Sequence, residues 1–282
     1  MALSGRIVAY HPGSSFPSVS VTGGACDLQC DHCRGRHLRH MLPAASPAKL
    51  LEIAEDLRSR GGSGLLISGG CDALGRVPLR GYAKAIRAIK TGTELLVKLH
   101  TGLLDREAAE DLVATSADCF SVDVVQDEAA IRDLLHLRSG PDAYALTLDS
   151  LFDAGAKRVV PHVCVGLSSS PEGDLKALDL IADYDVSALV VLTLLPTRGT
   201  PLSEVAPVPD VRVEGFVREA VGRLDCPVLL GCMRPRGNHR LEMRCIDLGV
   251  GGIAMPSRKV VELAKEKGYA VETRRSCCAL HV

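Results

Sequence analysis

Short apolar runs alternate with stretches of helical periodicity along most of the chain. The first helical stretch has Ser46 as a plausible N-cap, Pro47 at its first position and Gly61 beyond its end. Further apolar residues at helical spacing predict helices over 79–90, 106–114, 128–137, 175–182, 213–224 and 257–267. Runs of β-branched and apolar residues predict strands over 18–22, 65–68, 95–100, 119–124, 158–165, 188–194, 228–230 and 252–255.

This alternation predicts an α/β fold with parallel strands and right-handed crossovers. Near-continuous apolar runs such as LVVLTLL suit a sheet that is covered on both faces. We therefore expect a complete or nearly complete (β/α)8 TIM-type barrel, formed by one domain over residues 1–282. A doubly wound open sheet is the main alternative, because periodicity does not show whether a sheet closes. The first dozen residues and the cysteine-bearing tail 276–282 lie outside the barrel pattern.

Composition and charge exclude several classes of protein. Hydrophobic residues make up 46% of the 282 residues, which is enough for a sizeable core. The 33 Lys and Arg residues against 34 Asp and Glu give a net charge of -1, unlike the basic stripe of a nucleic-acid scaffold. No apolar run is long enough to cross a bilayer, and the N-terminus lacks the apolar core of a signal peptide. We expect a cytoplasmic protein that binds neither nucleic acid nor a membrane.

The chain has an unusual number of cysteines, 11 in all. The cytosol keeps thiols reduced, so a disulfide framework is not expected. An odd number of cysteines in a chain of this length also differs from a disulfide-stapled mini-domain. We expect several of these cysteines to bind metal and the others to be small buried hydrophobes.

Cys26, Cys30 and Cys33 form a CxxxCxxC motif directly after the first predicted strand. Thiolates at this spacing can converge on one face of a loop, and they are the standard ligands of iron–sulfur clusters. Three ligands leave one iron open to a substrate, and a loop after a barrel strand lies where active sites are built. A structural zinc site, completed by His32 or His37, is the alternative.

The motif, with His32 as the aromatic-type residue before its last cysteine, resembles the radical S-adenosylmethionine superfamily. The order of strands and helices agrees as well, so the resemblance covers most of the chain. It implies a [4Fe-4S] cluster whose unique iron is chelated by the amino and carboxyl groups of S-adenosylmethionine. It also implies one-electron cleavage of the sulfonium to a 5′-deoxyadenosyl radical, which abstracts hydrogen from an unactivated carbon.

The resemblance assigns further cofactor contacts at strand ends. Ser68, Gly69 and Gly70 follow the second strand, where glycine lets the backbone approach a ligand closely. In the resembled superfamily, a glycine-rich turn at this place contacts the methionine amino group, although an ordinary strand-to-helix turn is the alternative. Leu195, after the sixth strand, is the corresponding candidate for presenting backbone to the adenine.

Polar side chains in the apolar strands should line the barrel interior or its mouth, because burial without a partner is costly. Lys98 and His100 lie on the third strand, Asp123 on the fourth and His162 on the fifth. Asp123 is a candidate for holding the ribose hydroxyls or the methionine moiety. His100 and His162 are candidates for facing substrate, with a satisfied core histidine as the alternative for each.

Four other cysteines could hold an auxiliary iron–sulfur cluster: Cys71, Cys232, Cys277 and Cys278. Cys71 follows the Gly-Gly turn and Cys232 ends the seventh strand, so both belong at the barrel mouth, over which the tail could fold. The alternative is that Cys71 and Cys232 are small buried residues and that the Cys277-Cys278 pair belongs to a flexible, redox-sensitive tail. The remaining cysteines are assigned to the core or to no role: Cys119, Cys164, Cys226 and Cys245.

Several stretches resemble the biotin-synthase-related radical proteins, in particular one subunit of the two-component lipoyl synthases. These are SVTGGACDLQCDHCRGRHLRHM, SGGCDALGRVPL, CMRPRG and the Cys277-Cys278 pair. The resemblance implies sulfur insertion into a protein-bound octanoyl chain, with the auxiliary cluster as sulfur donor. It implies as partners a second radical subunit, a lipoyl-carrier protein or octanoyl-lysine peptide, and an electron donor such as ferredoxin or flavodoxin.

The chain departs from single-chain lipoyl synthase because no cysteine precedes Cys26, so that enzyme's auxiliary site does not carry over. Two other functions stay open. One is a radical methylase or a peptide or cofactor maturase, in which an auxiliary cluster relays electrons or grips substrate. The other is a non-catalytic iron–sulfur scaffold that stabilises another subunit.

Overall fold

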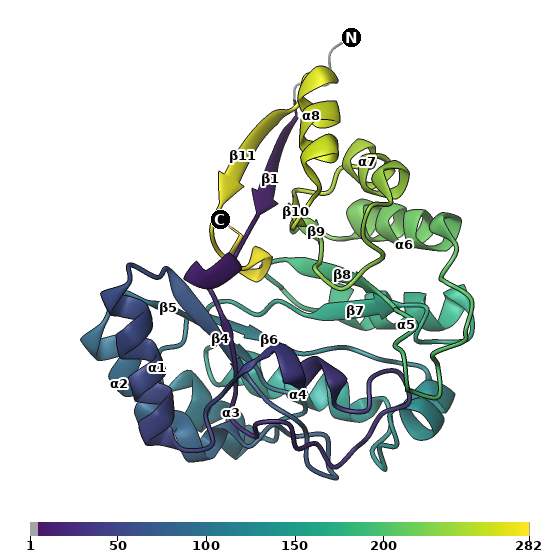
Figure 1. Ribbon diagram of the computed structural model, residues 1–282. Helices are drawn as coiled ribbons and strands as arrows, with labels where there is room; N and C mark the ends of the chain where they lie inside the picture. Colours follow the sequence, from purple (N-terminus) through teal and green to yellow (C-terminus); the bar gives the residue numbers. More distant parts are fainter. Residues whose placement is uncertain (1–4, 282) are drawn as a thin grey trace.

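Parallel strands alternate with outer helices in the structure, a computed structural model that describes residues 5–281 (Figure 1). Residues 1–4 and 282, the ends of the predicted domain and tail, lie outside the described residues. The strands are β1 (Arg6–Tyr10), β2 (Ser18–Ser20), β3 (Leu42–Pro43), β4 (Gly64–Ser68), β5 (Leu96–His100), β6 (Cys119–Ser121), β7 (His162–Val165), β8 (Leu189–Thr193), β9 (Val228–Leu230), β10 (Gly252–Ala254) and β11 (Ala270–Arg274).

Helices cover the outer faces of the sheets (Figure 1). The α-helices are α1 (Pro47–Ser59), α2 (Ala83–Gly92), α3 (Arg106–Val113), α4 (Asp142–Asp153), α5 (Pro171–Ala182), α6 (Asp210–Arg223), α7 (His239–Asp247) and α8 (Arg258–Glu266). The short helices are η1 (Gly13–Ser15), η2 (Arg36–His40), η3 (Leu79–Tyr82), the π-helical turn η4 (Ala130–Leu134) and η5 (Cys278–Leu280). The predicted start of α1 is confirmed, since the Ser46 side chain accepts a hydrogen bond from the Lys49 amide.

All strand pairs in the two sheets are parallel, with the orders β3-β2-β4-β5-β6 and β11-β1-β10-β9-β8-β7. Backbone hydrogen bonds join the sheets between β6 and the segment leading into β7, for example from the Val160 amide to the Phe120 carbonyl at 2.8 Å. Each of the eight predicted strand regions contains a strand of this series, namely β2, β4, β5, β6, β7, β8, β9 and β10. The predicted α/β fold with parallel strands is therefore confirmed, but the strands within residues 5–281 do not close the barrel.

The described residues near both ends of the chain belong to the barrel architecture, which corrects the expectation that these segments lie outside the barrel pattern. Strand β1 lies between β10 and β11, so the N-terminal segment extends the second sheet. Beyond β11, the turn η5 lies between the sheets and contacts β6, β8 and β10 (Figure 1). The tail therefore fills the interior on the open side of the barrel.

Two predicted elements have other boundaries in the structure, and several elements were not predicted. Strand β7 begins at His162 rather than at residue 158, because Pro161 has no N–H to donate to a ladder. The helix expected over 128–137 is only the turn η4, and it ends before His136, which adopts a left-handed φ of 57°. Helix α4 and strands β1, β3 and β11 were not predicted, and no range was predicted for α7.

The buried residues form two groups. The larger group packs the helices against the outer faces of the strands. The smaller group fills the interior around the tail and includes Tyr10, Cys119, Val190, Cys278 and Leu280. Among the described residues, no helix combines the length and apolar character needed to span a membrane.

Candidate active site

A cavity of about 320 Å³ lies beside the three-cysteine loop. It collects predicted residues from the ends of β2, β4, β5 and β6, as expected for the carboxyl ends of parallel strands. Of the residues predicted from sequence, the cavity is lined by Cys26, Cys30, Cys33, Ser68, Gly69, Gly70, Cys71, His100 and Asp123. Leu195 lies instead in the loop after β8 and is outside this lining.

The loop after β2 is held in shape by its own backbone. The amides of Cys33 and Arg34 both donate to the Cys30 carbonyl, at 3.0 and 2.8 Å. Gln29 and Arg34 adopt left-handed φ angles of 48° and 47°, which turn the chain sharply on either side of Cys30. Cys30 is buried, whereas Cys26 and Cys33 are half-buried. A hydrogen bond from Cys30, together with His32, lowers the pKa of Cys33 to about 4 against the effect of burial.

The glycine turn after β4 packs directly against this loop. A Cβ on Gly70 would lie 2.0 Å from the Ala25 carbonyl oxygen and 2.6 Å from Cys26 Cβ, so no larger residue fits without displacing the loop. The Gly70 amide donates to Thr22 Oγ1 at 2.7 Å, and the Asp27 amide donates to the Cys71 carbonyl at 2.8 Å. The two segments therefore form one unit around the cavity.

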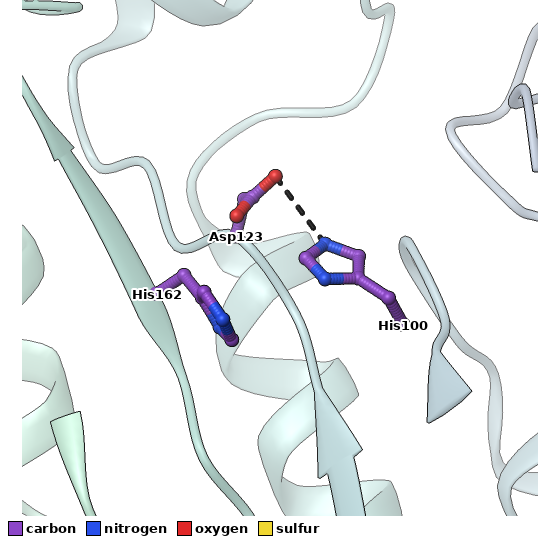
Figure 2. Close-up of side chains that lie close together, drawn as sticks. All are labelled: His100, Asp123 and His162. Atoms are coloured by element: carbon purple, nitrogen blue, oxygen red, sulfur yellow. Dashed lines mark ion pairs between the residues drawn. The ribbon is translucent and has the colours of Figure 1, made fainter. Parts of the chain in front are cut away.

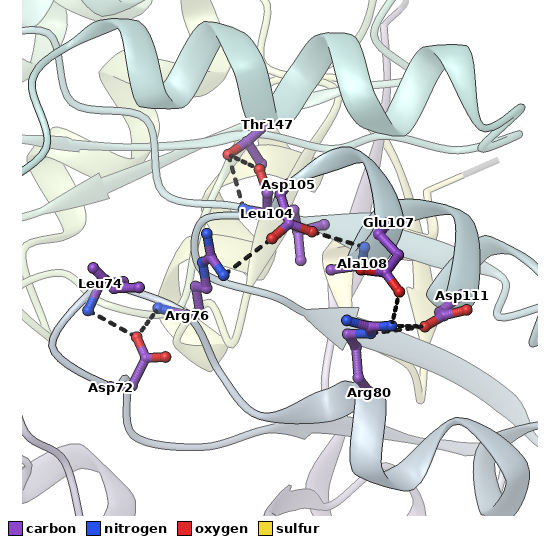
Figure 3. Close-up of polar contacts among 10 residues, drawn as sticks. All are labelled: Asp72, Leu74, Arg76, Arg80, Leu104, Asp105, Glu107, Ala108, Asp111 and Thr147. Atoms are coloured by element: carbon purple, nitrogen blue, oxygen red, sulfur yellow. Dashed lines mark hydrogen bonds and ion pairs between the residues drawn. The ribbon is translucent and has the colours of Figure 1, made fainter.

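The turn that follows Cys71 is braced from outside (Figure 3). The Asp72 carboxylate accepts hydrogen bonds from the amides of Leu74 and Arg76, each at 2.9 Å. The Arg76 guanidinium in turn pairs with Asp105, the N-cap of α3, at 3.0 Å. These contacts fix the glycine turn relative to the outer helices.

The residues around the cavity fit an iron–sulfur cluster with an open iron. Three thiols from one loop are soft ligands of the type that iron–sulfur clusters require. His32 lines the same cavity, and its Nδ1 is buried with no hydrogen-bond partner among the described residues. Because a buried polar atom normally has a partner, this nitrogen is available to a ligand in the cavity.

Asp123, His100 and His162 lie together, His100 at the end of β5, Asp123 just after β6 and His162 at the start of β7 (Figure 2). His100 Nε2 lies 3.3 Å from Asp123 Oδ2, and the His100 and His162 rings are 5.2 Å apart. Burial alone would raise the pKa of Asp123, but the two histidines and His32 hold it well below its usual value. Burial and the Lys98 charge keep the pKa of His162 well below its usual value. The ionised Asp123 carboxylate therefore faces the cavity, and the neutral imidazole of His162 lies behind it.

The structure separates the four cysteines that were predicted to form one auxiliary site. Cys71 lines the cavity beside Cys26. The thiols of Cys232, Cys277 and Cys278 instead lie near the buried amine of Lys98. Lys98 Nζ is 3.7 Å from Cys277 Sγ and 3.3 Å from His162 Nε2. Burial alone would lower the pKa of Lys98, but the surrounding cysteines raise it.

Several lining residues were not predicted from sequence. Cys164 was assigned to the core, yet it lines the cavity together with Tyr144 from α4 and Met233 from the loop after β9. Cys164 lies two residues after His162 on one strand, and this spacing is a signal that both face the interior. Tyr144 has no comparable signal, because α4 itself was missed.

No protein-family model matches the chain. In sequence it is similar to a biotin synthase of Thermotoga petrophila, with 23% identity over 193 residues that cover 65% of this chain. The match spans 62% of that protein, so the chain matches less than two thirds of its curated relative.

Solved structures share the fold at low identity. The [FeFe]-hydrogenase maturase HydG of Carboxydothermus hydrogenoformans has a TM-score of 0.68 at 16% identity, covering 95% of this chain and 68% of that chain. Methylornithine synthase PylB has a TM-score of 0.66 at 14% identity, covering 96% of this chain and 84% of that chain. Streptococcus suis SuiB, solved bound to S-adenosylmethionine, has a TM-score of 0.51 at 14% identity, and the match covers 96% of this chain and 51% of that chain. The chain is therefore similar in sequence to a biotin synthase, and it shares its fold with HydG and PylB.

Proposed function

We propose that the chain is a radical S-adenosylmethionine enzyme. The observation that carries this proposal is the cavity in which Cys26, Cys30 and Cys33 stand opposite Gly69, Gly70 and Asp123. When bound at the three thiols, a [4Fe-4S] cluster supplies the electron that cleaves the sulfonium of S-adenosylmethionine.

The protein's own groups bind and orient the cofactor in this proposal. The Gly69–Gly70 backbone lines the cavity, so it can contact the methionine amino group. The Asp123 carboxylate, kept ionised by His100, can accept hydrogen bonds from the ribose hydroxyls or the amino group.

We further propose that the reaction is sulfur insertion into a protein-bound octanoyl chain, as in lipoyl synthesis. The cavity wall supports an apolar acyl substrate, because beyond the cluster it is formed largely by side chains such as Leu103, Val125, Leu135, Leu137 and Leu167. A second radical subunit, a lipoyl-carrier protein or octanoyl-lysine peptide, and a ferredoxin or flavodoxin are the partners that this reaction would need.

Anaerobically reconstituted protein should form 5′-deoxyadenosine from S-adenosylmethionine when dithionite is added. The variant with Cys26, Cys30 and Cys33 all changed to alanine should form none, and a Cys226→Ala variant, changed outside the cavity, should behave as wild type. Absence of 5′-deoxyadenosine from wild-type protein that holds its full iron would support the scaffold function instead.

The substrate proposal needs a separate test. With an octanoyl-lysine peptide and the candidate partner subunit, mass spectrometry should detect sulfur on the peptide and loss of sulfide from the protein. A mass increase of one methyl group would overturn sulfur insertion in favour of a methylase.

A further inference from the structure

The segment that follows Cys33 forms a wall between the cavity and the outside of the molecule. It reads RGRHLRH over residues 34–40 and includes the short helix η2. The Arg36 amide donates to the Cys33 carbonyl at 2.8 Å, so the wall starts directly at the cysteine motif. Arg34 and Arg39 are exposed. Other residues of the same segment line the cavity, namely Gly35, His37 and Leu38. A group bound at the three thiols is therefore separated from this outer surface by a single segment of chain.

The outer side of this wall is basic and continues onto a second segment. None of residues 34–40 is acidic, and none of residues 197–203 is acidic. The two segments are in contact, because the Arg36 guanidinium donates to the Gly199 carbonyl at 3.2 Å, and a Cβ on Gly199 would collide with that guanidinium. This contact brings the exposed Arg198 to the same surface. We call the four arginines of this surface the basic rim: Arg34, Arg36, Arg39 and Arg198.

Most of the charge of the basic rim is not neutralised within the chain. Of the four rim arginines, only Arg34 makes an ion pair among residues 5–281, at 3.3 Å from Asp31. The Asp31 carboxylate also lies 3.1 Å from His136. The whole chain has a net charge of -1, so the excess of positive charge is local to the rim. Such a patch attracts an acidic partner and repels a basic one.

The apolar part of the cavity wall comes from other loops. Leu103 follows β5, Leu137 follows η4 and Leu167 follows β7. An acyl chain would bind along these side chains, whereas the basic rim lies on the wall that adjoins the cysteine motif. This arrangement favours a partner that exchanges electrons with the motif over a partner that delivers the acyl chain.

We propose that the basic rim is the docking surface for an acidic one-electron carrier protein, such as a flavodoxin of negative net charge. The proposal rests on the proposed function, because only a redox group at the three thiols needs an electron from outside. The reduced carrier loses one electron to that group, and no bond forms between the two proteins. Complementary charge on the rim speeds their encounter, and added salt screens this effect.

The test compares two double charge reversals that change the net charge of the chain equally. Arg39→Glu with Arg198→Glu alters the rim at two exposed side chains, and Arg87→Glu with Arg218→Glu alters exposed positions on α2 and α6 as the control. Formation of 5′-deoxyadenosine is measured with dithionite and with flavodoxin kept reduced by its reductase and NADPH. At low salt the rim variant should lose about ten-fold in kcat/KM for flavodoxin. It should keep its iron content and its dithionite-driven rate, and the control should keep all three.

Salt dependence and direct binding separate docking from a structural defect. Raising the salt from about 0.01 M to about 0.15 M shortens the screening length from about 30 Å to about 8 Å. The flavodoxin-driven rate of wild type and of the control should therefore fall with salt, and that of the rim variant should change little. Oxidised flavodoxin, followed by its flavin fluorescence, should bind more weakly to the rim variant than to the control. Equal losses in both double variants would overturn the proposal, because net charge rather than the rim would then govern the encounter.

The proposed function and the docking surface fail in distinguishable ways. If wild type forms 5′-deoxyadenosine with dithionite but the rim variant and the control use flavodoxin equally well, the docking surface is wrong and the enzyme function stands. If fully loaded wild type forms none with either reductant, the enzyme function is wrong, and weaker flavodoxin binding by the rim variant alone would still support the surface. A rim variant that uses flavodoxin normally but no longer binds an octanoyl-carrying protein would show that this protein, and not an electron carrier, occupies the rim.

Discussion

At the scale of single residues, His162 should give the fold a measurable pH dependence. Its pKa is held well below the usual value by burial and by the charge of Lys98, so the folded protein keeps the ring neutral. The unfolded chain binds a proton at this residue below a pH of about 6.5. The contribution of His162 to stability is therefore present above this pH and is lost as the pH falls, by up to about 1.4 kcal/mol per pH unit.

The comparison is between wild type and His162→Gln in metal-free protein, since glutamine keeps a hydrogen-bond acceptor for Lys98. Between pH 7.5 and pH 5.5, wild type should lose about 1.4 kcal/mol more unfolding free energy in urea than the variant does. Equal losses in the two proteins would mean that His162 is protonated in the folded state.

Residue spacing in the sequence was enough to predict some site residues but not others. Cys26, Cys30 and Cys33 lie within one loop, so their convergence follows from local spacing, and the structure places all three at the cavity. The proximity of Cys119 to Lys98 depends on the register of β5 against β6, which no local pattern encodes. The sequence gives no distance between strand ends. The prediction therefore grouped Cys71 with the tail cysteines, although the structure places Cys71 at the cavity.

At the scale of elements, the glycine turn after β4 and the cysteine loop after β2 should depend on each other. Gly70→Ala would place a methyl group 2.0 Å from the Ala25 carbonyl and should displace the loop, lowering the iron retained at the catalytic motif several-fold. Gly24→Ala is the matched control in the same loop, because a Cβ there meets nothing within 4 Å. Iron and sulfide analysis after anaerobic reconstitution compares the two variants. Equal iron in the two variants would contradict this dependence.

The order of elements was more predictable than the ends of the barrel. Eight strand regions followed from apolar runs, since each strand is buried on both faces. Strand β11 was missed because Ala270–Arg274 reads AVETR, a half-exposed edge sequence without a continuous apolar run. Strand β1 was missed although it reads RIVAY and is buried over its last four residues. Strand β1 and the edge strand β11 extend the second sheet on the open side, and the periodicity of the sequence does not show whether a sheet closes.

At the scale of the whole molecule, the tail should protect the interior. Ending the chain after Ser276 removes the buried side chains of Cys278, Ala279 and Leu280, which should cost about 4 kcal/mol of unfolding free energy at the usual value for apolar burial. In metal-free native protein, iodoacetamide should then alkylate Cys119, which is 0% exposed in the complete chain.

Cys245 is the internal control, because it is equally buried but lies in α7, among the residues of the larger core group. Peptide mass mapping should find Cys119 modified only in the shortened protein and Cys245 protected in both. Protection of Cys119 in the shortened protein would mean that the strands alone seal the interior.

The position of the tail also imposes an order on biosynthesis. Residues 277–280 follow in the sequence every strand that they contact, so these strands leave the ribosome first and the interior stays open during translation. Solutes can reach Cys119 during that interval, whereas the docked tail covers this thiol afterwards. The three cysteines of the motif lie in one loop at the cavity, and η5 contacts β6, β8 and β10 instead. Any reaction at Cys119 therefore has to precede tail docking, or the tail has to be released first.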